Sequence, residues 1–253
     1  MAEHTPRAFS GVDRLFGSGA YSKLQNASVT IVGVGGVGSW TAEAIARHGI
    51  QNITLIDLDN VAESNINRQL QALQSTLGMA KVDAIAQRIA LINPECRVSC
   101  VEDFLSPDNV AELLSSRADT VIDCTDQTSA KVAMAEHCHQ VGIALFMAGA
   151  AGGRTDPTRI RHADLGATQG DALLARVRTL LRRNARMNLL RKEHFGIEAV
   201  YSAEPMRKPE VEACDASAAP QGLNCAGYGS SVCVTASFGF TLAARAIEHL
   251  LKH

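Results

Sequence analysis

The stretch SVTIVGVGGVGSW, at positions 28–40, constrains the fold of this chain more than any other. Its β-branched run, 29–32, is typical of a buried strand, and small and apolar residues after the glycines are typical of a helix. The glycines are Gly33, Gly35, Gly36 and Gly38. They can form a strand-to-helix turn in which backbone N–H groups approach a phosphate. A turn that only permits close strand–helix packing needs the same residues, so the motif alone leaves both interpretations open.

Composition narrows the class of protein. The 253 residues are 46% apolar and 20% charged, and a formal net charge of −2 gives no general attraction to nucleic acid or membrane. The first residues lack the apolar core of a signal peptide. Seven scattered cysteines without a CxxC pair favour a reducing, cytoplasmic compartment and exclude the usual four-cysteine zinc site. The apolar stretch 232–251 contains Arg245 and Glu248, so we expect a buried strand and helix there and no stable membrane association.

Apolar runs alternate with helical patterns through the first 150 residues. The expected strands are 29–32, 53–58, 97–101, 120–125 and 143–147, and the expected helices are 79–92, 106–114 and 129–141. This alternation predicts an α/β, Rossmann-like fold, with a mostly parallel sheet and right-handed crossovers flanked by helices. The preceding segment, 13–24, is expected to be a short amphipathic element that packs on a neighbour or contributes to a dimer.

Charged residues after the expected strands indicate the ligand. Asp57 lies about 20 residues past the glycine turn, where a carboxylate accepts hydrogen bonds from a ribose, as in NAD dehydrogenases. Arg68 and Lys81, however, add two cations, which suit a triphosphate better than a dinucleotide. Asp126 follows an expected strand and suits Mg²⁺ held with phosphate oxygens. Each residue alone could be a helix cap or a solvated helix end, but together they favour a nucleoside triphosphate.

Five motifs in this order, GVGGVGS, LIDLD, SNINRQ, GMAK and IDCTDQ, resemble the adenylating domain of the ubiquitin-activating (E1) enzyme superfamily. The resemblance covers 14–153 and implies an E1-like fold that binds ATP and Mg²⁺. The cofactor-binding residues that it implies are Gly33, Gly35, Gly36, Gly38, Asp57, Asp59, Asn65, Arg68, Gln69, Lys81, Asp126 and Gln127. Among them, Gly36 meets the nucleotide and Asp57 the ribose, whereas Asp126 holds the metal. The resemblance assigns contacts with the phosphates to Asn65, Arg68 and Lys81, and Gln127 stands where the family commonly has asparagine.

The resemblance also implies a homodimer and a subfamily. Arg14 stands where the family places an arginine that reaches into the partner subunit's site. The two CxxC pairs of sulfur-carrier activators are absent, and segments 148–165 and 224–240 look like those of the E1-like enzymes that dehydrate threonylcarbamoyladenosine beside the tRNA anticodon. This subfamily implies an ATP-dependent ligase-type dehydratase. In the reaction that this resemblance implies, ATP adenylates the threonyl carboxylate, and the carbamoyl oxygen closes a ring with loss of AMP.

A basic segment supports an RNA partner independently. Residues 154–208 hold twelve Lys/Arg and six Asp/Glu, a net charge of +6, whereas the rest of the chain carries −8. Such a segment is typical of a phosphate-backbone footprint, and also of a mobile, solvated helix and loop. We therefore expect one E1-like domain over 1–253, with a basic, mobile insertion at about 165–220.

Three questions stay open at the level of the residues. Cys225 lies in an Asn-Cys-Ala-Gly loop and is either a thioester-forming nucleophile or a small buried thiol before the last strand, while Cys124 favours the core. The alternative functions are an E1-like activator of the C-terminal glycine of a small carrier protein and an NAD-dependent oxidoreductase or non-catalytic nucleotide-binding module. The residues also leave open a monovalent cation and a sulfur-transfer protein partner.

Overall fold

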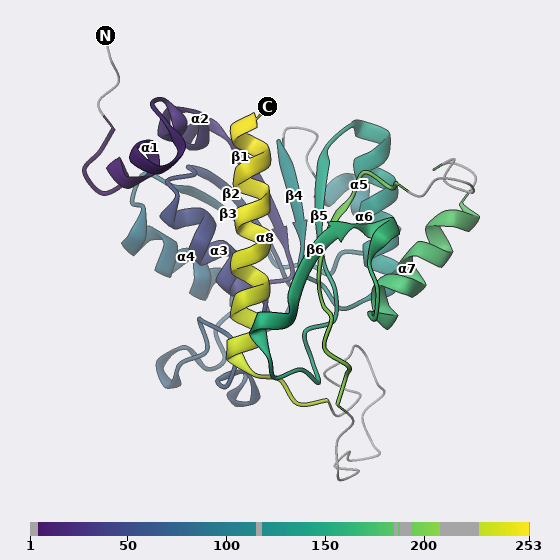
Figure 1. Cartoon of the computed structure of the whole chain (residues 1–253). Coiled ribbons are helices and arrows are strands. Elements are labelled where there is room, and N and C mark those ends of the chain that lie inside the picture. Colours follow the sequence, from purple (N-terminus) through teal and green to yellow (C-terminus); the bar gives the residue numbers. More distant parts are fainter. Residues whose placement is uncertain (1–4, 115–117, 185–186, 188–193, 208–227, 253) are drawn as a thin grey trace.

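The computed structural model describes residues 5–114, 118–184, 187, 194–207 and 228–252. Figure 1 shows a central sheet with helices on both of its faces. The strands are β1 Ser28–Val32, β2 Asn52–Ile56, β3 Arg97–Val101, β4 Thr120–Asp123, β5 Ala144–Ala148, β6 Ile160–Asp164 and β7 Glu198–Ser202. The helices are α1 Ser10–Phe16, α2 Ala20–Asn26, α3 Gly38–Arg47, α4 Lys81–Ile92, α5 Val110–Leu113, α6 Thr128–Val141, α7 Ala172–Arg183 and α8 Val232–Lys252. Short 3-10 helices are η1 Glu63–Asn65, η2 Gln74–Thr76, η3 Pro157–Arg159 and η4 Leu165–Ala167. The α/β class with a mostly parallel sheet is confirmed.

The strand order, β3-β2-β1-β4-β5-β7-β6, places the glycine turn at a switch in the topology. β1 lies between β2 and β4 and is parallel to both. The chain runs from β1 outward through β2 to β3, and then returns to β4 on the other side of β1. In sheets of this kind, ligands bind outside the carboxyl ends of the strands at the switch. Residues 33–37 follow β1 and residues 124–127 follow β4, so both loops lie at this edge.

The central strands are buried on both faces, which explains their continuous apolar runs. In β1, Ile31 packs in a core with α3, α4 and α8, whereas Val32 packs in the opposite core with α6 and α7. In β5, Phe146 belongs to the first core and Met147 to the second. This period of two follows from the alternating direction of side chains along a strand. The two cores thus pack against opposite faces of the sheet, whose carboxyl edge carries the loops after the strands.

The C-terminal apolar stretch differs from the prediction, because the expected strand does not form. One helix, α8, takes the place of the expected strand and helix. Its buried residues include Val234, Phe238 and Leu242, which recur at helical spacing and do not alternate. Gly239 allows α8 to cross α3 closely, since a Cβ there would lie 2.6 Å from the carbonyl oxygen of Val37. This packing outweighs the local strand preference of the β-branched residues.

The segment 165–220, expected as a basic insertion, contributes to the sheet through its described residues. β7 pairs with β5 in parallel and with β6 in antiparallel orientation. α7 packs on α6, and its apolar side is buried in the second core through Leu174 and Val177. Neither β6 nor β7 was expected. β6 is an edge strand of largely polar, half-exposed residues, so it lacks the apolar run that predicts a buried strand. The domain division itself stays a prediction.

The N-terminal segment forms two helices where one amphipathic element was expected. Gly17 and Gly19, with φ of +103° and +87°, separate α1 from α2. A single helix cannot continue through two residues in this conformation. Val12 and Tyr21 anchor the pair in the first core. In the part of the chain that the structure describes, none of the helices combines the length and apolar character that crossing a bilayer requires.

Candidate active site

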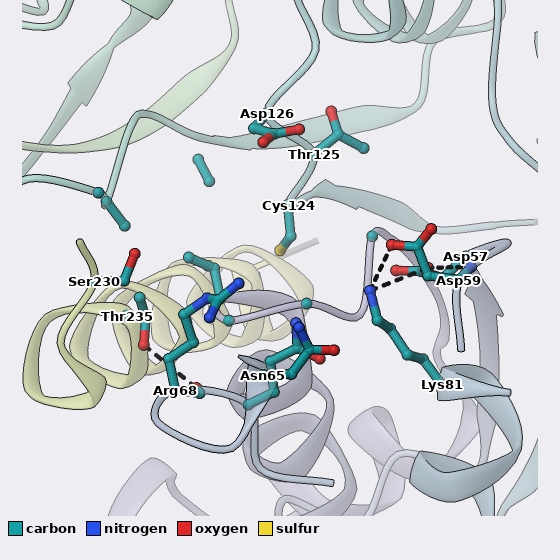
Figure 2. A pocket seen from close by; sticks show the side chains of 18 of the residues that line it. Asp57, Asp59, Asn65, Arg68, Lys81, Cys124, Thr125, Asp126, Ser230 and Thr235 are labelled. Atoms are coloured by element: carbon teal, nitrogen blue, oxygen red, sulfur yellow. Dashed lines mark hydrogen bonds and ion pairs between the residues drawn. The ribbon is translucent and has the colours of Figure 1, made fainter. Parts of the chain in front are cut away.

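A cavity of about 1280 Å³ opens at the carboxyl edge of the sheet, at the switch between β1 and β4. Its walls come from the loops after β1, β2, β4 and β5, from η1 and the residues after it, and from the start of α8. Figure 2 shows the polar side chains that line it. The predicted residues that line it are Gly33, Gly35, Gly36, Asp57, Asp59, Asn65, Arg68, Gln69, Lys81, Asp126 and Gln127. The residues that were expected at the carboxyl edge of the parallel sheet therefore lie around one cavity.

The glycine turn brings the backbone close to this cavity. Gly33 has φ +82°, and a Cβ there would lie 3.2 Å from the backbone of Cys124. Gly38 begins α3 and does not line the cavity. A Cβ at this position would lie only 1.8 Å from the carbonyl oxygen of Gly33, so the backbone there is closely packed. Gly36 borders the cavity, and its Cβ would meet Arg68 at 3.4 Å. Gly38 therefore serves close packing, and Gly33 both packs against Cys124 and borders the cavity, whereas Gly35 and Gly36 leave space for a ligand.

Asp57 anchors the turn and meets a lysine. Its Oδ2 accepts a hydrogen bond from the N–H of Val34 at 2.8 Å, and its Oδ1 accepts one from the N–H of Asp59 at 2.9 Å. Lys81 Nζ lies 3.9 Å from Asp57 Oδ1 and 2.6 Å from Asp59 Oδ2. Burial raises the pKa of the Asp57 carboxyl, and Lys81 with the two N–H groups counteracts part of this effect. The ammonium of Lys81 thus lies at the ribose end expected for Asp57.

Arg68 lies at the other end of the cavity, beside Ser230 and Thr235 (Figure 2). Its Nη1 donates to the carbonyl oxygen of Ser64 at 2.6 Å and to Asn67 Oδ1 at 3.0 Å. Burial lowers the pKa of Arg68, but an arginine keeps its charge in proteins. The two cations thus bracket the cavity instead of standing side by side.

Asn65 lies between these cations in Figure 2. Its Oδ1 accepts from the N–H of Ala62 at 3.1 Å, and the residue is 8% exposed. Because its oxygen is occupied locally, the amide NH₂ is the group that remains to donate to a ligand.

A buried ion pair supports the loop after β4. Asp123 and Lys131 both have fully buried side chains, and Lys131 Nζ lies 3.1 Å from Asp123 Oδ2. Asp123 Oδ1 accepts hydrogen bonds from the N–H and hydroxyl of Thr125 at 3.0 and 2.7 Å. The pair therefore fixes the residue next to Asp126, which lies across the cavity from Arg68 in Figure 2.

Cys124 lies just after β4, not within the strand as expected, and it lines the cavity. Its Sγ lies 3.7 Å from the hydroxyl oxygen of Thr41. Burial raises the pKa of its thiol to about 12. A thiol with this pKa is protonated at neutral pH and is a weak nucleophile.

A second buried pair holds the wall formed by 149–152. Arg154, 1% exposed, donates to the carbonyl oxygens of Ala150 and Ser202, each at 3.0 Å. Asp171 Oδ2 accepts from the N–H of Ala150 at 2.8 Å and lies 3.8 Å from Arg154 Nη2. Burial lowers the pKa of Arg154, and Asp171 counteracts this effect. Arg154 therefore supports the cavity wall and is not available to RNA.

One further predicted residue lies away from the cavity. Arg14 lies on the exposed side of α1 and is not among the residues that line the cavity. Cys225 lies outside the described residues. The sequence interpretation missed lining residues in 103–105, 149–152 and 228–230, and also Thr235. Residues 149–152 follow β5, whose carboxyl end meets the same sheet edge, so that signal was present.

Comparison with known proteins supplies the relatives of this chain. The ThiF family model matches residues 11–253. The chain is 42% identical over 246 residues to a Haemophilus influenzae protein named tRNA threonylcarbamoyladenosine dehydratase, over 96% of this chain and 93% of the relative. It is 42% identical over 250 residues to the Escherichia coli protein of that name, over 96% and 92%. It is also similar to a solved structure, E. coli tRNA N6-threonylcarbamoyladenosine dehydratase TcdA in complex with ATP, with a TM-score of 0.87 and 39% identity over 97% and 94%.

Proposed function

The chain belongs to the ThiF family, and we propose on this premise that it dehydrates threonylcarbamoyladenosine in tRNA with consumption of ATP. The observation that carries the proposal is the cavity at the glycine turn, lined by the predicted ATP-binding side chains. The chain matches the two relatives reported above, which are named for this activity, over nearly their whole length, and the E. coli enzyme is solved with ATP and with AMP.

The chemistry proceeds by activation of a carboxylate. A carboxylate oxygen of the threonyl group attacks the α-phosphorus of ATP, and pyrophosphate leaves. The neighbouring carbamoyl group then attacks the acyl carbon and loses a proton, and AMP leaves with the carboxylate oxygen. Because the attacking group is tethered in the same molecule, its effective concentration is high. The protein has to position the reactants and stabilise the charge on the phosphates, and no nucleophilic side chain is required.

The charged side chains suggest how the nucleotide is oriented along the cavity. Asp57 lies where a carboxylate accepts hydrogen bonds from ribose hydroxyls, next to Lys81. Asn65 and Arg68 offer an amide and a guanidinium farther along, so the triphosphate runs from Lys81 toward Arg68. In this arrangement Lys81 exchanges its ion pair with exposed Asp59 for a phosphate oxygen.

The residues also fit a magnesium ion. Among the described residues, no group of three His, Cys, Asp or Glu could hold a metal alone. Mg²⁺ that is bound to ATP needs only one or two carboxylates besides phosphate oxygens and water, and Asp126 supplies one at the cavity. When bound there, the ion offsets negative charge on the phosphates.

Exposed arginines on one part of the chain offer a surface for tRNA. They are Arg159, Arg161, Arg176, Arg182, Arg183 and Arg207. Arg178 has an internal role instead, because its Nη1 donates to the carbonyl oxygen of Thr168 at 2.9 Å. Exposed Arg182 also lies 5.5 Å from the ring centre of Phe195. The exposed arginines fit contacts to phosphates, which position RNA without reading its sequence.

We propose that Arg14, which is exposed on α1, completes the site of a second copy of the chain. If Arg14 completes the partner subunit's site, a mixture of Arg14→Ala and Lys81→Ala chains should regain activity in mixed dimers, because one of the two sites then carries both residues. Each variant alone should be inactive. The reaction moves no sulfur, so its chemistry does not require a sulfur-transfer protein.

The test is incubation of the full chain with ATP, Mg²⁺ and unfractionated tRNA. Mass spectrometry of the digested tRNA should show the modified nucleoside lighter by one water, and chromatography should show matching AMP. Substitution of both Arg68 and Lys81 by alanine should abolish AMP formation. AMP formation that survives both substitutions would contradict the proposed site.

A further inference from the structure

A buried glutamine, Gln71, joins the glycine turn to the cavity although it does not line the cavity. It is 2% exposed, and its Nε2 donates to the carbonyl oxygen of Val34 at 2.8 Å and to Gln69 Oε1 at 3.1 Å. Its own Oε1 is buried and has no hydrogen-bond partner among the described residues. A buried, unpaired amide oxygen is unfavourable and calls for an explanation.

The two acceptors explain why the Gln71 amide keeps this orientation. A backbone carbonyl can only accept, so the atom of Gln71 that faces Val34 must be the NH₂ group. A half-turn of the amide would place its oxygen against that carbonyl oxygen. The same NH₂ group then fixes the neighbouring side chain, because the atom of Gln69 that faces it must be an acceptor, Oε1.

The Gln69 amide is therefore oriented with its NH₂ group toward the ligand space. With Oε1 held by Gln71, its Nε2 points to the glycine turn, 3.7 Å from where a Cβ on Gly35 would stand. Gln69 lines the cavity and is 6% exposed. A reversed amide would present an oxygen to a negatively charged ligand.

We propose that Gln71 is a positioning residue that fixes the orientation of the Gln69 amide, so that Gln69 Nε2 donates a hydrogen bond to a phosphate oxygen of the bound nucleotide. This inference deepens the proposed function, because it rests on a nucleotide phosphate at the glycine turn. It adds a residue outside the cavity wall to the machinery that recognises the phosphates.

Gln71 also supports the backbone of the turn, and a test has to separate the two roles. The N–H of Val34 is held by Asp57 Oδ2 at 2.8 Å, and its carbonyl oxygen by Gln71 at 2.8 Å. A purely structural role would loosen the turn for every ligand. A role through Gln69 would affect only ligands that carry phosphate, and only while Gln69 is present.

The experiment is a double-mutant cycle on the full chain with Gln71→Met, which nearly keeps the side-chain volume, and Gln69→Leu. Calorimetric titration would measure the Kd for ATP and for adenosine. Gln71→Met should weaken ATP binding about tenfold, the loss of one oriented hydrogen bond to a charged group, and should leave adenosine binding unchanged. In the Gln69→Leu background, Gln71→Met should change the Kd for ATP by less than about twofold. Gln74→Met, at an exposed glutamine three residues along, is the matched control.

A second variant keeps the inference open to refutation if Gln71→Met lowers the thermal stability of the free protein. Gln69→Glu retains an acceptor for Gln71 and replaces the NH₂ group by an oxygen, so it should weaken ATP binding more than Gln69→Leu does. Three results would overturn this inference and leave the proposed function standing: additive losses of ATP affinity in the cycle, an equal loss of adenosine affinity, or normal ATP binding by Gln69→Glu. A wild-type chain that bound no ATP would overturn the proposed function as well.

Discussion

The buried ion pair beneath the cavity gives a prediction that depends on pH. Asp123 and Lys131 have fully buried side chains, and Lys131 Nζ lies 3.1 Å from Asp123 Oδ2. Lys131→Met removes the counter-charge and leaves Oδ2 facing an apolar side chain, while Thr125 still donates twice to Oδ1. Removal of one partner of a buried pair costs about 3–5 kcal/mol of the free energy of unfolding. We expect the lower end of this range, because the two hydrogen bonds remain.

The sign of the pH dependence follows from the pKa of Asp123. Burial raises this pKa, and Lys131 and Thr125 counteract part of the effect. A raised carboxyl pKa means that stability is fully present below the unfolded pKa and is lost as pH rises through the folded pKa. Without Lys131 the folded pKa rises further. The Lys131→Met substitution should therefore destabilise the protein more at pH 8 than at pH 5.

The assay is urea unfolding at both pH values, followed by the fluorescence of Trp40, the single tryptophan. Trp40 reports on the packing of α3 and α8, since its ring contacts Phe240 with centroids 5.8 Å apart. The double variant Lys131→Met/Asp123→Asn removes both charges and should recover to within about 2 kcal/mol of the wild type. A cost for Lys131→Met below about 1 kcal/mol, equal at both pH values, would refute the reasoning.

Three further predictions follow from other parts of the molecule. Gly38→Ala should prevent stable folding, since its Cβ would lie 1.8 Å from a carbonyl oxygen, whereas Gly36→Ala, with contacts at 3.4 Å, should fold and bind ATP more weakly; circular dichroism and ATP titration distinguish them. Glu43→Gln should cost about 1–2 kcal/mol at pH 7. Burial raises the pKa of Glu43, but hydrogen bonds from two arginines outweigh it and hold the pKa below its usual value, so this stability is lost as pH falls through the folded pKa, and acid unfolding curves of variant and wild type should converge. Charge reversal at Arg176 and Arg183 should weaken tRNA binding most at low salt, and an unchanged Kd in filter binding would remove the proposed RNA surface.

Residues at the carboxyl edge of the sheet could be predicted from the sequence, because parallel strands end together. The alternating runs fix β1, β2 and β4, and the residues that follow each strand then have to meet, as Gly36, Asp57 and Asp126 do. The distance between Arg68 and Lys81 along the cavity could not be predicted, because it depends on how the loop of residues 57–80 folds back.

Features that depend on tertiary contacts escaped prediction. α8 is a helix because its buried positions match the surface of α3, although its first residues favour a strand. Gln71 is polar and reads as a solvated loop residue, and only the folded chain brings it to the carbonyl oxygen of Val34. The pairing of Arg154 with Asp171 likewise turns a residue counted in a basic surface into a buried support.

The central claim is that the cavity at the glycine turn activates a carboxylate as an acyl-adenylate. The most direct measurement uses tRNA whose threonyl carboxylate carries ¹⁸O, incubated with the full chain, ATP and Mg²⁺. Adenylation predicts that the dehydrated nucleoside retains one carboxylate oxygen and that the other appears in the phosphate of AMP. Label found in inorganic phosphate, with ADP as the second product, would contradict the account.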